Sequence, residues 1–168
     1  MYKISVIGAG NVGGTTALRL ASLGIGEIVL ADKLKGFAQG KVLDLKDSQG
    51  LMRQDYNITG TDDINHIKGS SIVVITAGLA RRPDMSREDL LIKNIEIIKD
   101  VALSVKQLAQ DAKVIVVSNP VDILTYAALK ILGFKETKVF GMGTSLDASR
   151  FANLISEELK LSINDVET

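Results

Sequence analysis

The sequence predicts an α/β fold in which a doubly wound parallel sheet carries helices on both faces. Apolar runs rich in Val and Ile recur along the 168 residues, at 3–7, 27–31, 72–76 and 114–118, with weaker ones near 56–59 and 138–141. The strong runs are continuous rather than alternating, which is typical of parallel strands buried on both faces. Helical patterns lie between the runs, and this alternation builds a parallel sheet with right-handed crossovers.

The junction between the first strand and the first helix carries a Gly-x-Gly-x-x-Gly motif, Gly8-Ala9-Gly10-Asn11-Val12-Gly13. In such a turn the first glycine permits a tight bend, the second lets the backbone approach a pyrophosphate, and the third lets helix and strand pack closely. A helical stripe follows, formed by Val12, Thr16, Ala17, Leu20 and Leu23. Because free N–H groups at a helix N-terminus favour an anion, the junction predicts a dinucleotide site.

An acidic residue stands where a dinucleotide site needs one. Asp32 ends the run at 27–31 and lies about 20 residues beyond the last glycine of the motif. A carboxylate there accepts hydrogen bonds from both ribose hydroxyls and repels a 2′-phosphate. The sequence therefore predicts NAD rather than NADP, and the alternative is a βαβ unit without a ligand.

The composition excludes several classes of function. Twenty basic and twenty acidic residues cancel to a formal net charge of zero, so nothing indicates a nucleic-acid or membrane partner. The absence of cysteine excludes disulfides and thiolate metal sites, and we expect no metal. The first strand begins at residue 3, which leaves no room for a targeting peptide, so the expected compartment is the cytoplasm.

Three segments follow predicted strands, at the edge where open parallel sheets bind ligands. They contain Arg81, Arg82 and Arg87 in one loop, Asn119 before a proline, and Asp147 three residues before Arg150. Guanidinium groups clamp carboxylates through paired hydrogen bonds, and a loop before a helix can close like a lid. Each segment also has an ordinary interpretation: a solvated basic loop, an Asn-Pro turn and a surface ion pair.

The helix after the arginine loop has a recognisable start. Ser86 is followed three residues later by Asp89, which is close to a capping box. The apolar positions of this helix, beginning with Leu91, Ile95 and Ile98, fit one helix face.

Together these segments resemble the N-terminal half of the lactate/malate dehydrogenase family, and its malate enzymes most of all. The matching pieces are GAGNVGG at 8–14, VITAGLARRPDMSREDL at 74–90, VSNPVDI at 117–123 and LDASRF at 146–151. They follow the family's order and span nearly the whole chain.

The resemblance implies a role for each matching residue. Gly8–Gly13 and Asp32 would bind the pyrophosphate and adenosine ribose of NAD, and Asn94 would line the cofactor together with Val117, Ser118 and Asn119. Asn119 would also touch the substrate oxygen. Arg150 would grip the substrate's C1 carboxylate, and Arg87 would polarise the reacting carbonyl. Asp147 would orient a catalytic histidine that gives and takes a proton.

Arg81 would select the substrate. The family's lactate enzymes usually have glutamine at this position, whereas its malate enzymes have an arginine that pairs with the second carboxylate of oxaloacetate. An unpaired guanidinium in a closed site would be costly, so the resemblance favours malate. Asp84 departs from the glycine that malate enzymes commonly have.

The histidine that the family needs is not among these residues. His66 is the single histidine, and we interpret it as a surface residue on the amino-terminal side of the following strand, away from the ligand edge. In the family the base lies in a Gly-x-His-Gly-type segment shortly beyond 162–168. We therefore expect the 168 residues alone to bind NAD weakly and not to turn over.

We expect residues 1–145 to form a Rossmann NAD-binding domain and residues 146–168 to begin a second, substrate domain that is largely absent from this chain. The resemblance implies a homodimer or homotetramer acting on a small dicarboxylate, malate or oxaloacetate, in the tricarboxylic acid cycle. Three alternatives remain: a lactate dehydrogenase, a stand-alone non-catalytic NAD-binding module, and a divided enzyme whose other half is a separate chain.

Overall fold

The computed structural model describes residues 2–80 and 85–168, and in these residues it shows the predicted parallel sheet. Six strands lie in the order β3-β2-β1-β4-β5-β6, and each pairs in parallel with its neighbours. The strands are β1 (Tyr2–Ile7), β2 (Gly26–Ala31), β3 (Ile58–Thr61), β4 (Ile72–Ile75), β5 (Lys113–Val116) and β6 (Val139–Gly141). The winding direction reverses between β1 and β4, so the doubly wound α/β prediction is confirmed.

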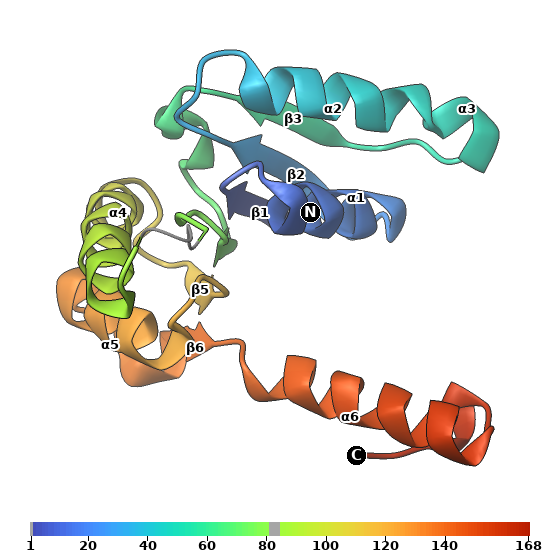
Figure 1. Cartoon of the computed structure of the whole chain (residues 1–168). Helices are drawn as coiled ribbons and strands as arrows, with labels where there is room; N and C mark the ends of the chain where they lie inside the picture. The colour runs from blue at the N-terminus through green and yellow to red at the C-terminus, as the bar shows by residue number, and fades with distance from the viewer. Residues whose placement is uncertain (1, 81–84) are drawn as a thin grey trace.

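Helices connect successive strands and cover both faces of the sheet (Figure 1). The α-helices are α1 (Asn11–Ser22), α2 (Phe37–Asp47), α3 (Gln49–Met52), α4 (Arg87–Leu108), α5 (Val121–Leu132) and α6 (Thr144–Leu159). Short 3₁₀ turns are η1 (Ile64–Ile67), η2 (Glu136–Lys138) and η3 (Ile163–Asp165). No helix in the described part of the chain is long and apolar enough to cross a bilayer.

Two hydrophobic cores flank the sheet, one on each face. On one face Ala17 of α1 and Val42 of α2 pack over Val6 and Leu30. On the other face Ile98 of α4 and Leu124 of α5 pack over a set of strand residues that includes Val73, Ile75, Val114 and Val116. Neighbouring residues of β4 therefore face opposite cores, which is why the apolar runs of the sequence are continuous.

The third strand lies two residues later than the sequence predicts. The pattern places a strand near 56–59, whereas β3 pairs Ile58 with Ile28 and Thr61 with Ala31. Tyr56 is buried in the core beside α2 and contributes apolar surface without joining the ladder. The shift brings the carbonyl oxygen of Thr61 within 3.0 Å of the Asp32 amide nitrogen.

Helix α6 stands apart from the rest of the fold (Figure 1). Among its residues only Ala152 is buried, and large apolar side chains such as Phe151, Leu154 and Leu159 are exposed. The helix begins at Thr144, two residues before the domain boundary that the sequence suggests at 146. That boundary stays a prediction.

The predicted start of α4 is present in full. Ser86 Oγ accepts a hydrogen bond from the Asp89 amide at 3.0 Å, and the Asp89 carboxylate accepts from the Ser86 amide at 3.2 Å and from the Ser86 hydroxyl at 2.6 Å. These bonds, the Ser86 hydroxyl first, lower the pKa of Asp89 from its ordinary value of 3.8. The ionised carboxylate therefore stabilises the folded state.

We expect Ser86→Ala to destabilise the fold by about 0.5–2 kcal/mol at neutral pH, because a serine cap is lost. Urea unfolding at pH 7 measures the change. Ser86→Thr is the control that keeps a capping hydroxyl.

The folded pKa of Asp89 is depressed, so the contribution of its carboxylate to stability is complete above pH 3.8 and disappears as the pH falls through the folded pKa. Urea unfolding of Asp89→Asn and of the parent chain, at pH 7 and at stepwise lower pH, measures this dependence. A destabilisation by Asp89→Asn that grows as the pH falls would contradict the assignment.

Candidate cofactor and substrate site

The glycine turn after β1 is fixed by two close approaches between main-chain segments. Gly8 has φ +105°, and a Cβ atom there would lie 2.6 Å from the Ala77 amide nitrogen. A Cβ atom on Gly13 would overlap the carbonyl oxygen of Gly8. Thr76, directly after β4, donates from its hydroxyl to the Gly8 carbonyl at 2.9 Å. Gly8 and Gly13 are therefore required by the fold itself.

Gly10 differs from the other two glycines of the motif. It has φ −64°, an ordinary value for any residue, and a Cβ atom there would meet nothing within 4 Å. It is also exposed. Nothing in the described residues explains why position 10 lacks a side chain, so the open space in front of it is suited to a ligand that approaches the backbone.

The N-terminus of α1 is open beside Gly10. Gly10 is its N-cap and contributes no side-chain cap, and the first turn contains no acidic residue. The first amides of the helix have no intrahelical acceptor, and they form the positive end of the helix dipole. Helix α4 contrasts with this, since Ser86 and Asp89 cap it and Glu88 adds a second acid. An anion fits the start of α1.

Asp32 lies directly after β2, where the sequence places it. Its Oδ2 accepts a hydrogen bond from the Ala9 amide at 2.8 Å, and its Oδ1 accepts from the Leu34 amide at 3.0 Å. The structure thus brings the predicted acid into contact with the predicted glycine turn.

The next strand ends are joined by a buried asparagine. Asn94 of α4 is 2% exposed. Its Oδ1 accepts from the Leu79 amide at 2.8 Å, and its Nδ2 donates to the Asn119 carbonyl at 3.0 Å. Ser118 is also buried and donates to the Ala77 carbonyl at 2.6 Å. The polar atoms of these two side chains are used to hold the ends of β4 and β5 together, and Asn119 itself is exposed before a cis peptide bond to Pro120.

The predicted substrate residues are only partly assembled. Arg150 Nη1 lies 3.2 Å from Asp147 Oδ1 on α6, which confirms that the two share one helix face. Both side chains are exposed, and so is Arg87 at the first position of α4. The predicted residues Arg81, Arg82 and Asp84 lie outside the described residues.

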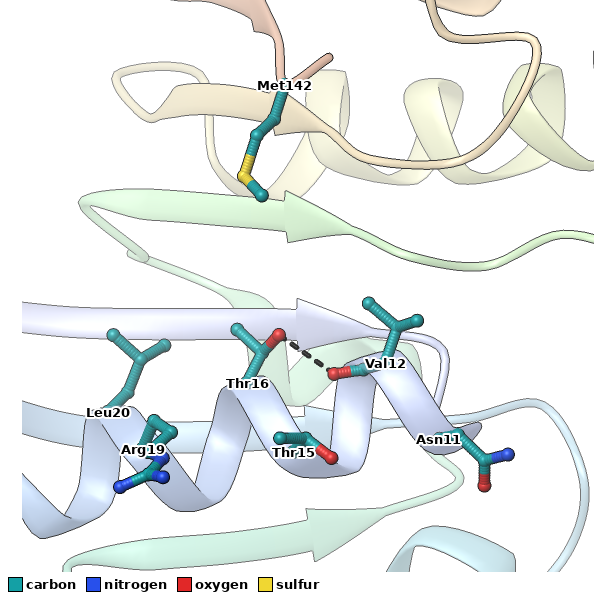
Figure 2. Close-up of a pocket in the computed structure, with 7 residues that line it drawn as sticks. All are labelled: Asn11, Val12, Thr15, Thr16, Arg19, Leu20 and Met142. Atoms are coloured by element: carbon teal, nitrogen blue, oxygen red, sulfur yellow. Dashed lines mark hydrogen bonds between the residues drawn. The ribbon is translucent and has the colours of Figure 1, made fainter. Parts of the chain in front are cut away.

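An open groove of about 600 Å³ runs between α1 and the segment after β6. Figure 2 shows Met142 on one side and the outer face of α1 on the other. The lining residues are Asn11, Val12, Thr15, Thr16, Arg19, Leu20 and Met142. Val12 and Met142 are apolar and exposed, so the groove offers a partly apolar surface next to the glycine turn.

The position of His66 corrects one detail of the sequence interpretation. Its Nδ1 lies 3.1 Å from the Thr61 hydroxyl and 3.2 Å from the Asp63 carbonyl oxygen, so the ring sits at the carboxyl end of β3 rather than away from the ligand edge of the sheet. The interpretation missed this because η1 folds back on the strand end. His66 is nevertheless an exposed surface residue, as expected.

Sequence reasoning did not single out Thr76 or Met142. Thr76 binds the glycine turn from the neighbouring strand, and Met142 forms one wall of the groove. Thr76 ends a predicted strand at the ligand edge, which is the one signal that could have identified it. Met142 directly follows the predicted strand at 138–141, so its position at the same edge is the signal that could have identified it. In the described residues no group of three His, Cys, Asp or Glu side chains is placed to hold a metal.

The open glycine turn, the uncapped start of α1 and the acid after β2 define a dinucleotide-binding Rossmann domain. Residues 2–141 match the model of a protein family described as "lactate/malate dehydrogenase, NAD binding domain". The chain therefore belongs to the lactate/malate dehydrogenase family, as its NAD-binding domain.

Individual relatives agree with this assignment. The malate dehydrogenase of Methanosarcina mazei is 55% identical over 167 residues, covering 99% of this chain and 54% of the relative. The apo malate dehydrogenase from Picrophilus torridus superposes with a TM-score of 0.93 at 43% identity, covering 99% of this chain and 53% of that chain. A lactate dehydrogenase from Cryptosporidium parvum, complexed with lactic acid and NAD, superposes with a TM-score of 0.91 at 36% identity. The match covers 99% of this chain and 52% of that chain. The chain thus spans about half the length of the relatives it matches.

We expect Asn94→Ala to destabilise the domain by about 1–3 kcal/mol, because it removes the partners of Leu79 and Asn119 from a buried position. Urea unfolding measures the change. Asn153→Ala on the exposed face of α6 is the matched control and should stay within about 0.5 kcal/mol of the parent. Equal stability of the two variants would show that the buried amide does not hold the strand ends.

Proposed function

We propose that this chain is the cofactor-binding half of an NAD-dependent malate dehydrogenase, which moves a hydride between malate and NAD. The observation that carries the proposal is the open space at Gly10, in front of the uncapped start of α1 and next to Asp32. A pyrophosphate fits the first two features and a ribose diol fits the third.

The main-chain amides of Ala9 to Gly13 would hold the pyrophosphate. Asp32 would accept hydrogen bonds from the adenosine ribose, because each of its oxygens has a second lone pair besides the one that the Ala9 or Leu34 amide uses. Val12 and Met142 would place apolar surface against the nicotinamide ring, and Val117, Ser118 and Asn94 would form the supported wall behind it. When bound, NAD supplies the hydride acceptor.

The exposed cations at the carboxyl edge of the sheet suit a dicarboxylate. Arg150 would bind the C1 carboxylate, Arg87 would polarise the carbonyl, and Asn119 would contact the same oxygen. Arg81 would bind the second carboxylate. Asp147, now paired with Arg150 at 3.2 Å, would orient a histidine supplied from outside these 168 residues. His66 cannot serve, because it is held at β3 by Thr61 and Asp63.

The second candidate function is that of a lactate dehydrogenase, since the fold of a lactate enzyme fits this chain with a TM-score of 0.91. Arg81 supports malate over lactate, because a guanidinium would face the methyl group of pyruvate without a partner. We further propose that the enzyme of which this chain would form one half is a cytoplasmic homodimer or homotetramer.

We expect Gly10→Ala to weaken NADH binding by roughly tenfold or more, because a methyl group would occupy the space that the pyrophosphate needs. The variant should fold normally, since that methyl group meets no protein atom within 4 Å. NADH fluorescence titration and thermal unfolding measure the two effects.

Gly40→Ala on α2 is the matched control for this substitution. A Cβ atom there also meets nothing within 4 Å, and the site lies inside a helix, where alanine is favoured over glycine. It should leave NADH affinity unchanged. If Gly10→Ala binds NADH as tightly as the parent chain, the pyrophosphate is not held at this turn.

An enzyme that joins these 168 residues to the second half of the Methanosarcina mazei malate dehydrogenase tests the choice of substrate. We expect kcat/KM for oxaloacetate to exceed that for pyruvate by at least about 100-fold, because a charged pocket rejects the analogue without its partner. Arg81→Gln should reduce this preference, whereas Arg53→Gln at the end of α3 should not.

The 168 residues alone are the control for turnover and should show none, because they contain no histidine beside Asp147 and Arg150. Preference of the joined enzyme for pyruvate would assign it to the lactate enzymes. Binding of NADH without reduction of either substrate would instead favour a non-catalytic NAD-binding module.

A further inference from the structure

The turn between β2 and α2 spans residues 32–36 and carries the acid of the proposed ribose site. Asp32 opens the turn, and its two carboxylate oxygens accept from the Ala9 and Leu34 amides. Residues 33–36 are all exposed, so core packing does not fix their conformation. The Ala9 contact comes from the glycine turn, whereas the Leu34 contact depends on the conformation of the exposed turn and so on what holds its far end.

The far end is Gly36, which is in the left-handed conformation with φ +72° and precedes α2. Helix α2 has no side-chain cap from its own N-cap residue and no acid in its first turn. Ordering a glycine is costly, because it loses more conformational freedom on folding than any other residue. A contact from outside the turn can offset this cost.

Asp62 supplies that contact from the end of β3. Its Oδ2 accepts a hydrogen bond from the Gly36 amide at 3.0 Å, across 26 positions of sequence. The side chain of Gln39, in the first turn of α2, also bonds to it. The carbonyl oxygen of Thr61, the residue before Asp62, accepts a hydrogen bond from the Asp32 amide at 3.0 Å. The end of β3 thus holds the turn at both Asp32 and Gly36.

The ionised form of Asp62 is the one that makes these contacts. The Gly36 amide first, and then the Gln39 side chain, lower the pKa of this carboxyl from its ordinary value of 3.8. Asp62 therefore acts as a remote anionic cap for α2.

We propose that Asp62 is a positioning residue of the cofactor site, which pre-orients Asp32 toward the adenosine ribose by holding the Gly36 end of the turn. The inference rests on the proposed role of Asp32. Without the contact, the exposed turn has to be ordered when the ribose binds, and that ordering reduces affinity.

Binding of ADP-ribose to the 168-residue chain tests the inference, with affinities measured by NMR titration. Asp62→Ala should bind ADP-ribose roughly three- to tenfold more weakly than the parent chain, the range expected for loss of one hydrogen bond. A second ligand, 2′-deoxy-ADP-ribose, lacks one hydroxyl that Asp32 would accept from. The parent chain should prefer ADP-ribose over this analogue, and Asp62→Ala should show a smaller preference, because the two losses act through the same carboxylate.

Asp63→Ala is the matched control. Asp63 is the next residue and accepts from the Asn65 amide at 2.9 Å and from the Asn65 side chain at 2.8 Å, and the same bonds lower its pKa. The substitution Asp63→Ala therefore removes the same charge and a comparable N-terminal cap, but the cap belongs to η1 rather than to α2. Asp63→Ala should change neither the affinity nor the preference.

The outcomes separate the two proposals. If the parent chain prefers ADP-ribose and Asp62→Ala keeps both its affinity and its preference, the role of Asp62 is wrong and the cofactor site stands. The role of Asp62 is also wrong if Asp63→Ala has the same effect. If the parent chain does not bind ADP-ribose or does not distinguish the two ligands, the proposed role of Asp32 fails, and that of Asp62 fails with it.

Discussion

The contact between Gly13 and the carbonyl oxygen of Gly8 is the constraint on which the site depends. No side chain fits between them, so α1 begins directly above the end of β1. Thr76 adds a hydrogen bond to the same carbonyl from the end of β4. The strand order reverses between β1 and β4, and a crevice at such a reversal is where open α/β sheets bind ligands. One close approach therefore places the open end of α1 at the binding edge.

Around that crevice the residues of the candidate site divide into a buried group and an exposed group. Asn94 and Ser118 are buried, and their side chains form hydrogen bonds with main-chain atoms, which makes the strand ends rigid. Gly10, Arg87, Asn119 and Arg150 are exposed and leave space or charge for a ligand. A rigid inner layer below an open outer layer is what a site needs if it is to hold a flexible dinucleotide in one conformation.

Several features of the site were predictable because they depend on local spacing. Residues three apart share a helix face, so the contact between Asp147 and Arg150 followed from their positions alone. The cap at Ser86 followed in the same way. The sequence does not predict the partners of Asn94, because its amide bonds to Leu79 and Asn119, 15 and 25 positions away, and no local rule gives such contacts.

By itself the sequence determined the order of strands and helices, the glycine turn and the acid after β2, because hydrophobic periodicity and glycine sterics act over a few residues. Only the tertiary structure decided that Asp62 reaches Gly36, that η1 carries His66 back to Thr61, and that Met142 faces α1 across a groove. These contacts join segments that are distant in sequence. They depend on the register and stacking of whole strands, which are fixed when the sheet and its two cores form together.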